Sequence, residues 1–286
     1  MRPPVAVALG DPRGVGPELV ARALPRLKGR WILFGDTRTL SRMPKGPGIE
    51  KRRVPADAGM NSLLAGIDLC LSGEACALFT APVSKAALGV KGQTEVLSER
   101  TGRPTTMMLA GKGLRVSLVT VHEPLAKVPR LVTRRRVRET ALRTAEGLKR
   151  WFSIRRPRIA VLGLNPHAGE GGMLGREEIR EIAPAVRDLR RAGIRAEGPL
   201  PADGAFGRWR QDAFDAYVAM YHDQGLSALK AVAFSQGVTL TLGLPFLRTS
   251  PDHGTAYGLA GTGKADPGPT LAALRMAQRV AESEKS

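Results

Sequence analysis

The sequence predicts an α/β protein in which mainly parallel strands are covered by helices on both faces. Three observations support this fold class. Short apolar runs recur along the 286-residue chain, most of them end in turn-like segments rich in Gly, Pro or Asp, and several turns lead into segments with apolar residues at helical spacing. This alternation is typical of parallel sheets, because strands that are buried on both faces are apolar throughout.

The first predicted unit consists of a strand, a glycine-rich turn and a helix. Residues 5–9 form the apolar run, residues 10–16 the turn and residues 17–24 the helix. Pro17 suits the first position of a helix, and Glu18 is favoured by the positive end of the helix dipole. The turn is a candidate for phosphate binding, although it matches neither the GxGxxG nor the Walker A pattern. A tight strand-to-helix turn without a ligand is an equal interpretation.

The same alternation continues to the C-terminal end of the chain. Further strands are predicted at residues 31–36, 77–80, 114–120, 158–163, 215–220 and 239–242. Helices are predicted at residues 132–151, 177–192 and 270–284, the last of them preceded by Pro269. The Pro- and Gly-rich stretch 43–59 is expected to be a connecting loop.

Length and composition restrict the class of protein further. The chain is long enough for one large domain or two ordinary ones. No apolar run reaches the ~18 residues that a membrane span requires, and the N-terminus leads directly into the first strand, so we expect a cytoplasmic protein without a signal peptide. Cys70 and Cys76 are not spaced as CxxC, which favours reduced core thiols over a zinc site.

The formal net charge of +18 raises the question of nucleic-acid binding. Arginines cluster in several predicted helix surfaces and loop edges, at residues 134–136, 155–156, 158 and 190–191. Only Trp151 and Phe152 accompany them, without a basic tail or a known nucleic-acid motif, so we expect no specific nucleic-acid partner. A basic surface that attracts an anionic substrate is the preferred interpretation. A nucleic-acid-binding protein on an inactive enzyme fold is the alternative from another class.

All four histidines lie in short Gly-, Pro- or Asp-rich motifs, where a predicted strand runs into a turn. They are His122, His167, His222 and His253. Imidazole is a common metal ligand, and the carboxyl ends of strands carry the ligand sites of α/β proteins. The first three can hold one divalent metal and leave a position open for substrate, provided that the fold brings them together. A hydrogen-bonded loop residue is the alternative for each of them.

Polar residues beside these histidines extend the candidate site. Asp223 can orient the neighbouring His222 or carry a proton. Asn165 and Glu170 are candidate cleft groups, with loop capping as an equal interpretation.

Three residues downstream of His222 suit an anionic substrate, namely Lys230, Thr239 and Arg248. Arginine binds phosphate or carboxylate in a bidentate way, and Lys230 supplies a second positive charge. Arg248 follows the apolar run 242–247, which argues against a solvated surface charge.

Four motifs indicate a family. They read GLNPHAGEGG at 163–172, GPLPAD at 198–203, AMYHDQG at 219–225 and LGLPFLRTS at 242–250. Through them, nearly the whole chain resembles the 4-hydroxythreonine-4-phosphate dehydrogenase family of vitamin B6 biosynthesis. The segment 252–266 and the opening turn are similar to the adenosine-side loop and the first loop of the isocitrate and isopropylmalate dehydrogenase fold.

The resemblance implies two α/β/α domains, each with a mainly parallel sheet, and an interdomain cleft. A discontinuous NAD-binding domain is expected at residues 1–85 plus 230–286. A domain that binds metal and substrate and forms the dimer is expected at residues 86–229. The expected activity is the NAD-dependent and metal-dependent oxidation of 4-phosphohydroxy-L-threonine, with decarboxylation to 3-amino-2-oxopropyl phosphate. NADP is the alternative nucleotide, and Zn, Mg, Co or Mn is the expected metal.

The resemblance also implies roles for individual residues. The metal ligands would be His122, His167 and His222, two from one subunit of a homodimer and the third from its partner. The substrate contacts would be Gln93, Thr94, Lys230, Thr239 and Arg248. The cofactor contacts would be Asp252, His253, Gly254 and Thr255. Lys230 and Asp223 are the candidates for proton transfer.

Two residues depart from the family pattern at substrate-contacting positions. The family has His where this chain has Gln93, and Asn where it has Thr239. Both departures concern the substrate and leave the metal and nucleotide residues intact. A related dehydrogenase for another sugar-acid phosphate, such as erythronate or threonate 4-phosphate, or for an aromatic dihydrodiol is therefore the alternative within the same class.

Overall fold

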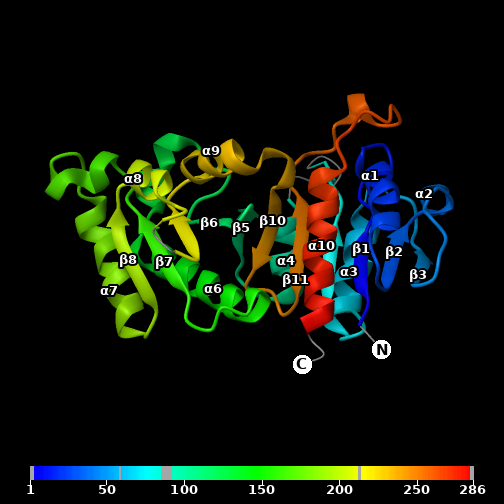
Figure 1. The fold of residues 1–286 in the computed structure, drawn as a ribbon, viewed down its shortest axis with the longest axis horizontal. Coiled ribbons are helices and arrows are strands. Elements are labelled where there is room, and N and C mark those ends of the chain that lie inside the picture. Colours follow the sequence, from blue (N-terminus) through cyan, green and yellow to red (C-terminus); the bar gives the residue numbers. More distant parts are fainter. Residues whose placement is uncertain (1–2, 58, 85–91, 212–213, 284–286) are drawn as a thin grey trace. The chain divides into compact units, whose positions relative to one another are not determined.

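The computed structural model describes residues 3–57, 59–84, 92–211 and 214–283. The chain forms two compact units, which we call the first unit (Met1–Thr105 with Ser235–Ser286) and the second unit (Thr106–Phe234). Both contain mainly parallel strands with helices packed against them, so the predicted α/β class is confirmed (Figure 1). None of the helices in the described ranges is long and apolar enough to cross a membrane.

The described residues of the first unit form six strands in the spatial order β3-β2-β1-β4-β11-β10. Neighbouring strands are parallel, except that β10 and β11 form an antiparallel pair. The strands are β1 (Val5–Ala8), β2 (Trp31–Gly35), β3 (Ile49–Arg53), β4 (Ala77–Thr80), β10 (Val238–Leu242) and β11 (Leu247–Pro251).

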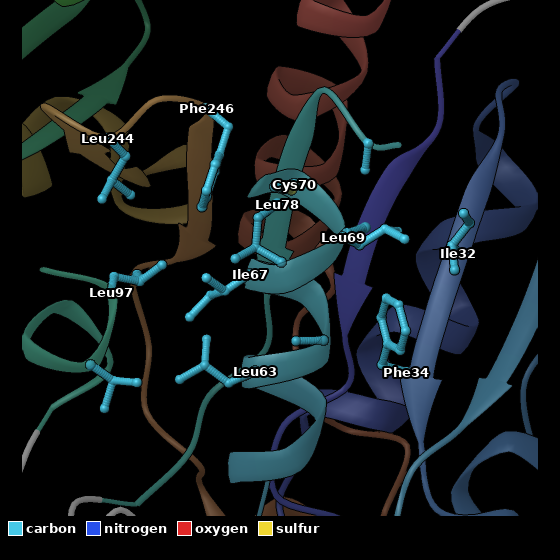
Figure 2. Packing of buried hydrophobic residues seen from close by; sticks show 14 residues of the cluster. Ile32, Phe34, Leu63, Ile67, Leu69, Cys70, Leu78, Leu97, Leu244 and Phe246 are labelled. Carbon is cyan, nitrogen blue, oxygen red and sulfur yellow. The ribbon is translucent and has the colours of Figure 1, made fainter. Parts of the chain in front are cut away.

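Helices pack on these strands as the burial pattern requires. Successive strand residues point to opposite faces, and every residue of β1 is buried, so both faces are covered. Helices α3 (Met60–Leu71) and α4 (Gln93–Thr101) pack on one face, in a core that includes Phe34, Ile67 and Leu97 (Figure 2). Helix α10 (Gly268–Ser283) lies along β11 and packs against α1 (Gly16–Ala23) (Figure 1).

In the second unit, the part of the chain that the structure describes forms five strands in the spatial order β5-β6-β9-β7-β8. Of these described strand pairs, β5–β6 is antiparallel and the others are parallel. The strands are β5 (Thr106–Gly111), β6 (Leu114–Leu118), β7 (Arg158–Leu162), β8 (Arg195–Leu200) and β9 (Ala216–Ala219).

Two separate apolar cores cover the two faces of this sheet. Ile159 and Val161 of β7 pack with α6 (Arg134–Phe152) and α7 (Ala183–Arg191). The alternate residues Ala160 and Leu162 pack with α8 (Ala202–Gly207) and α9 (His222–Ala233). Helix α6 begins where Thr133 accepts a hydrogen bond from the Arg136 amide, as a helix N-cap does.

Shorter helices connect these elements. They are α2 (Thr37–Ser41), α5 (Val128–Leu131), the π-helical turn η4 (Glu178–Ile182) and the 3-10 helices η1 (Leu24–Arg26), η2 (Leu125–Lys127), η3 (Pro166–Gly172), η5 (Phe234–Gln236) and η6 (Tyr257–Leu259).

Most of the predicted elements are present, and one prediction is wrong. The stretch 43–59 was expected to be a loop, but it contains the edge strand β3. The sequence of β3 is IEKRR, and its charged residues conceal the apolar pattern on which strand prediction depends. Cys70 and Cys76 are buried thiols rather than halves of a disulfide, as predicted.

The two units divide at other residues than the expected domain boundaries after residues 85 and 229. The expected boundary after residue 85 falls outside the described residues, and the structure assigns α4 to the first unit. The reason is packing, because Val96 and Leu97 join the core that contains Leu63 and Ile67. Helix α9 stays in the second unit to its end, so Lys230 belongs to the second unit rather than to the first.

Candidate functional site

Three histidines follow three neighbouring parallel strands of the second unit. His122 follows β6, His222 follows β9 and His167 follows β7, and β9 lies between the other two strands. Because parallel strands end at the same edge of a sheet, the loops that carry these histidines leave the sheet on one side. This edge is where we place the candidate metal centre.

His122 and His222 lie close together. The centroids of their rings are 5.6 Å apart. Pairing between the two strands continues beyond their ends, where the Val119 amide donates to the Ala219 carbonyl and the Thr120 hydroxyl donates to the Met220 carbonyl at 2.7 Å. This extension fixes the start of both histidine loops.

The ring of His222 is oriented by its neighbour. His222 is the first residue of α9, and its Nδ1 lies 2.7 Å from Oδ1 of Asp223. With Nδ1 engaged by a carboxylate, Nε2 is the nitrogen that can ligate a metal. This contact supports the orienting role predicted for Asp223.

Gln224 joins the ends of strands β9 and β7. Its side-chain oxygen accepts from the Met220 amide at 2.7 Å, and its side-chain nitrogen donates to the Gly163 carbonyl at 2.7 Å. One amide therefore connects the loop that carries His222 with the loop that carries His167.

The His167 loop has an unusual backbone. Five consecutive residues, from His167 to Gly171, have positive φ angles between 44° and 80°. Three of them, His167, Ala168 and Glu170, are not glycine, and L-residues adopt this region only at a cost. Such strain persists only where the surroundings impose it, and it is frequent at functional sites.

Glu178 holds the residues that lead into this loop. Its buried carboxylate accepts hydrogen bonds from the amides of Leu164 and Asn165 and from the Asn165 side chain, at 2.7–2.9 Å. A Cβ atom at Gly169 would lie 2.6 Å from the same carboxylate, so this position requires glycine. Sequence reasoning missed Glu178, because its position in a helical pattern gives no sign that the side chain turns inward.

In the single chain, His167 is exposed to solvent. The ring is 68 % exposed, and its Nδ1 lies 3.7 Å from Glu170. Within the described ranges of one chain, no group of three His, Cys, Asp or Glu side chains is placed to hold a metal ion. The structure thus brings His122 and His222 together and leaves His167 exposed.

The candidate anion-binding residues divide between the two units. Thr239 on β10 and Arg248 on β11 are buried in the first unit, whereas Lys230 lies on α9 of the second unit, eight residues after His222. Gln93 and Thr94 begin helix α4 of the first unit.

Arg248 has a network of neutral hydrogen-bond partners. Its guanidinium donates to the hydroxyl of Thr80 through two nitrogens, at 2.7 and 3.0 Å, to the hydroxyl of Thr241 at 3.2 Å, and to the side-chain oxygen of Gln93. Burial lowers the pKa of Arg248 to about 10, so the group is still positively charged at pH 7.

The candidate cofactor loop contacts the opening turn within the first unit. The Val15 amide donates to the Thr255 carbonyl at 2.9 Å. His253 is held by the Gly254 carbonyl at 3.0 Å and lies 3.5 Å from the hydroxyl of Thr270. Asp252 comes directly after β11. The two segments that resemble nucleotide-binding loops are therefore neighbours.

A buried carboxylate strengthens this contact. Asp11 accepts from the backbone amide of Arg13 at 3.0 Å, from its guanidinium at 3.2 Å and from the Tyr257 hydroxyl at 2.6 Å. Burial raises the pKa of Asp11, but the hydrogen bonds from Arg13 and Tyr257 outweigh burial and lower the pKa below its usual value. No sequence signal singled out Tyr257, because only the fold brings it to Asp11.

Comparison with known proteins gives a consistent result. The family model described as "Pyridoxal phosphate biosynthetic protein PdxA" matches residues 46–277. A 4-hydroxythreonine-4-phosphate dehydrogenase of Geobacter metallireducens is 44 % identical, with 100 % of this chain and 97 % of the relative covered.

Solved structures agree with this match. A 4-hydroxythreonine-4-phosphate dehydrogenase from Klebsiella pneumoniae has a TM-score of 0.86 at 33 % identity, covering 97 % of this chain and 99 % of that one. A terephthalate 1,2-cis-dihydrodiol dehydrogenase from Burkholderia xenovorans has a TM-score of 0.71 at 30 % identity, covering 96 % and 97 %.

We predict that Glu178→Gln weakens the binding of a divalent metal. The amide cannot accept the same set of hydrogen bonds, so the His167 loop loses its fixed geometry, and affinity should fall about 10- to 100-fold, as for other residues that support a ligand. Metal titration by isothermal calorimetry measures the change. Glu177→Gln is the matched control, because the neighbouring Glu177 accepts from the side chain of Asn165, whereas the amides of Leu164 and Asn165 donate to Glu178. Equal affinities in both variants would contradict the role of Glu178.

We also predict a pH-dependent loss of stability in Asp11→Asn. A carboxyl whose pKa is lower in the folded than in the unfolded protein stabilises the fold above the unfolded pKa of about 4, and this contribution disappears as the pH falls through the folded pKa. The difference in unfolding free energy between wild type and variant should therefore be largest at neutral pH and shrink below about pH 4. Urea unfolding at several pH values tests this. Asp68→Asn, at an exposed position, serves as the control. A difference in unfolding free energy for Asp11→Asn that does not depend on pH would contradict the predicted link between the pKa of Asp11 and stability.

Proposed function

This chain belongs to the pyridoxal phosphate biosynthetic protein PdxA family, and we propose that it oxidises 4-phosphohydroxy-L-threonine with NAD in vitamin B6 biosynthesis. The products would be 3-amino-2-oxopropyl phosphate, carbon dioxide and NADH. The relatives are named 4-hydroxythreonine-4-phosphate dehydrogenases, and the similarity covers 97–99 % of their length. This similarity is the observation that carries the proposal. We place the activity in the cytoplasm.

Metal ligation by His122, His167 and His222 fits the donor chemistry of this edge of the sheet. Two imidazoles lie within 5.6 Å of each other, and the Asp223 contact at Nδ1 of His222 leaves Nε2 for ligation. A bound Zn²⁺, Mg²⁺, Co²⁺ or Mn²⁺ would polarise the alcohol oxygen and stabilise the negative charge that develops on it. Gln224 and Glu178 hold the loops so that these ligands keep their positions.

The remaining roles are those that the family pattern implies. Arg248 and Lys230 provide positive charge for the anionic groups of the substrate, with polar contacts from Thr94 and Thr239. Gln93 takes part through its hydrogen bond with Arg248. Proton transfer is assigned to Lys230 or Asp223. Asp223 also orients His222, so its loss would affect ligation as well as proton transfer.

The nucleotide site would lie where the candidate cofactor loop meets the opening turn. We propose that Asp252, His253, Gly254 and Thr255 bind NAD, or NADP as the alternative. The cofactor provides the hydride chemistry, and the two loops provide its position. The contact of Thr255 with Val15 and the contact of Tyr257 with Asp11 make this position depend on both loops together.

A homodimer with a shared site is part of the proposal. Exposed apolar side chains flank the histidine loops, with Leu125 after His122 and Met173 after His167. Large apolar side chains exposed beside a ligand site are typical of surfaces that a second chain covers. Association of two copies would cover these side chains and place the exposed His167 in an enclosed site.

A dehydrogenase for another substrate is the second candidate function. The similarity to a terephthalate dihydrodiol dehydrogenase at 30 % identity favours it, together with Gln93 and Thr239 at substrate positions. A nucleic-acid-binding role would use the +18 net charge, but described arginines such as Arg134 and Arg100 are paired with Asp188 and Asp68.

NADH production distinguishes these candidates. The purified protein is assayed against 4-phosphohydroxy-L-threonine, four-carbon sugar-acid phosphates and an aromatic dihydrodiol, each with Zn²⁺, Mg²⁺, Mn²⁺ or Co²⁺ and after chelation. We expect turnover of 4-phosphohydroxy-L-threonine that chelation abolishes and metal restores. Preferential turnover of another member of the panel would reassign the substrate, and metal-independent turnover would contradict the role of the histidines.

A mixing experiment tests the shared site. His167→Ala and His222→Ala should each be inactive alone, and mixing them with subunit exchange should restore some activity, because a hybrid dimer can contain one intact set of ligands. The expected recovery is measured as NADH production, with sedimentation to confirm the dimer. Fully active monomers, or no recovery despite exchange, would contradict a site shared between subunits.

A further inference from the structure

The guanidinium of Arg248 is buried among partners that carry no charge. Four of its hydrogen bonds go to the oxygens of Thr80, Thr241 and Gln93. Among the described residues, no acidic side chain lies within ion-pair distance of it. Burying a cation costs free energy unless the cation is paired with an anion. A guanidinium that is held by neutral oxygens alone therefore indicates that its charge serves an anionic ligand rather than these residues.

The side-chain amide of Gln93 has only one orientation that satisfies this network. Its oxygen must face the guanidinium, because arginine can only donate, and it also accepts from the Thr80 hydroxyl at 2.7 Å. Its nitrogen must face the Ala81 carbonyl, to which it donates at 2.9 Å. The oxygen therefore has two donors already, and Gln93 is fully committed on its acceptor side.

The hydroxyl of Thr80 is also fully used in hydrogen bonds. Its hydroxyl accepts from two nitrogens of Arg248 and gives its single hydrogen to Gln93. Strand β4, strand β11 and the start of α4 thus meet at one guanidinium, and the network fixes its plane without reducing its charge.

We propose that Gln93 is a positioning residue that holds Arg248 in place while leaving its positive charge uncompensated for an oxyanion of the substrate. This inference rests on the proposed function and assigns Gln93 an indirect role. The oxyanion is a phosphate or carboxylate group that Arg248 binds. Gln93 acts through the guanidinium rather than through its own contact with the substrate.

The chemistry of the residue at this position decides the charge of the site. A carboxylate in place of the amide would form an ion pair with Arg248 and cancel the charge that attracts the anion. It would also offset the cost of burying an unpaired cation. This gain should exceed the loss of the hydrogen bond from the Gln93 nitrogen to the Ala81 carbonyl, so the free protein should become more stable. Stability and anion affinity are therefore expected to change in opposite directions, whereas a purely structural residue would change both in the same direction.

Gln93→Glu tests the proposal, with Gln236→Glu as the control. Gln236 is exposed in η5 of the same unit, so this substitution makes the same change in net charge away from Arg248. For Gln93→Glu we expect a melting temperature about 2–4 °C higher than wild type. KM for the phosphorylated substrate should be roughly ten- to hundredfold higher, from the loss of one interaction with a charged group.

Anion binding is also measured without turnover. Thermal shifts with inorganic phosphate and with acetate show which oxyanion Arg248 prefers, and Gln93→Glu should lose the preferred shift while Gln236→Glu keeps it. If the anion shift depends on Gln93 but no substrate is oxidised, the proposed function fails and the positioning role stands. If oxidation occurs and Gln93→Glu leaves KM and the anion shift unchanged, the positioning role fails and the function stands.

Gln93→Met covers the case in which the glutamate variant does not fold. Methionine has a similar size, accepts only weakly and adds no charge, so it should lower the melting temperature. Anion affinity should fall by up to about tenfold, which is less than in Gln93→Glu, because Arg248 loses a positioning contact but keeps its charge. An anion affinity equal to that of wild type in Gln93→Met would overturn the proposal, because Arg248 would then not depend on Gln93 for its position. A Gln93→Glu protein that is both less stable and weaker in binding would overturn it as well.

Discussion

Parallel pairing of β6, β9 and β7 is the constraint on which the candidate metal centre depends. Parallel strands end at a common edge, so three loops that are far apart in sequence leave the sheet together, and each of them carries one histidine. Gln224 connects the ends of two of these strands through a single amide. A slip of one residue in register would turn the strand residues to the opposite face and would also separate the groups that Gln224 joins.

Buried charged groups hold the functional segments of both units, and each is satisfied in a different way. Glu178 accepts from backbone amides, Asp11 pairs with Arg13 and with a tyrosine hydroxyl, and Arg248 has neutral partners. Buried ions contribute little to stability after desolvation, so their retention at loops is better explained by geometry than by stability. The apolar cores stabilise each fold, and these charges determine how its loops are shaped.

The sequence was informative where a local pattern carried the signal. Histidines such as His167 could be located because each lies at the end of an apolar run, and the α/β class followed from the alternation of such runs. The supporting residues could not be found in this way, because Glu178 and Tyr257 act through partners that only the folded chain brings near. Strand β3 was missed for another reason, since an edge strand can be charged and still pair on one side.

The left-handed backbone of the His167 loop also limits which substitutions this protein can accept. Glycines at positions 163, 169 and 175 are crowded by the groups that hold the loop, and a side chain added at Gly169 would collide with the Glu178 carboxylate. The loop and Glu178 must therefore vary together, because a substitution in one of them removes contacts on which the other depends. Transfer of this loop to another scaffold would need residues 163–178 as one block, since the histidine motif alone would not keep its shape.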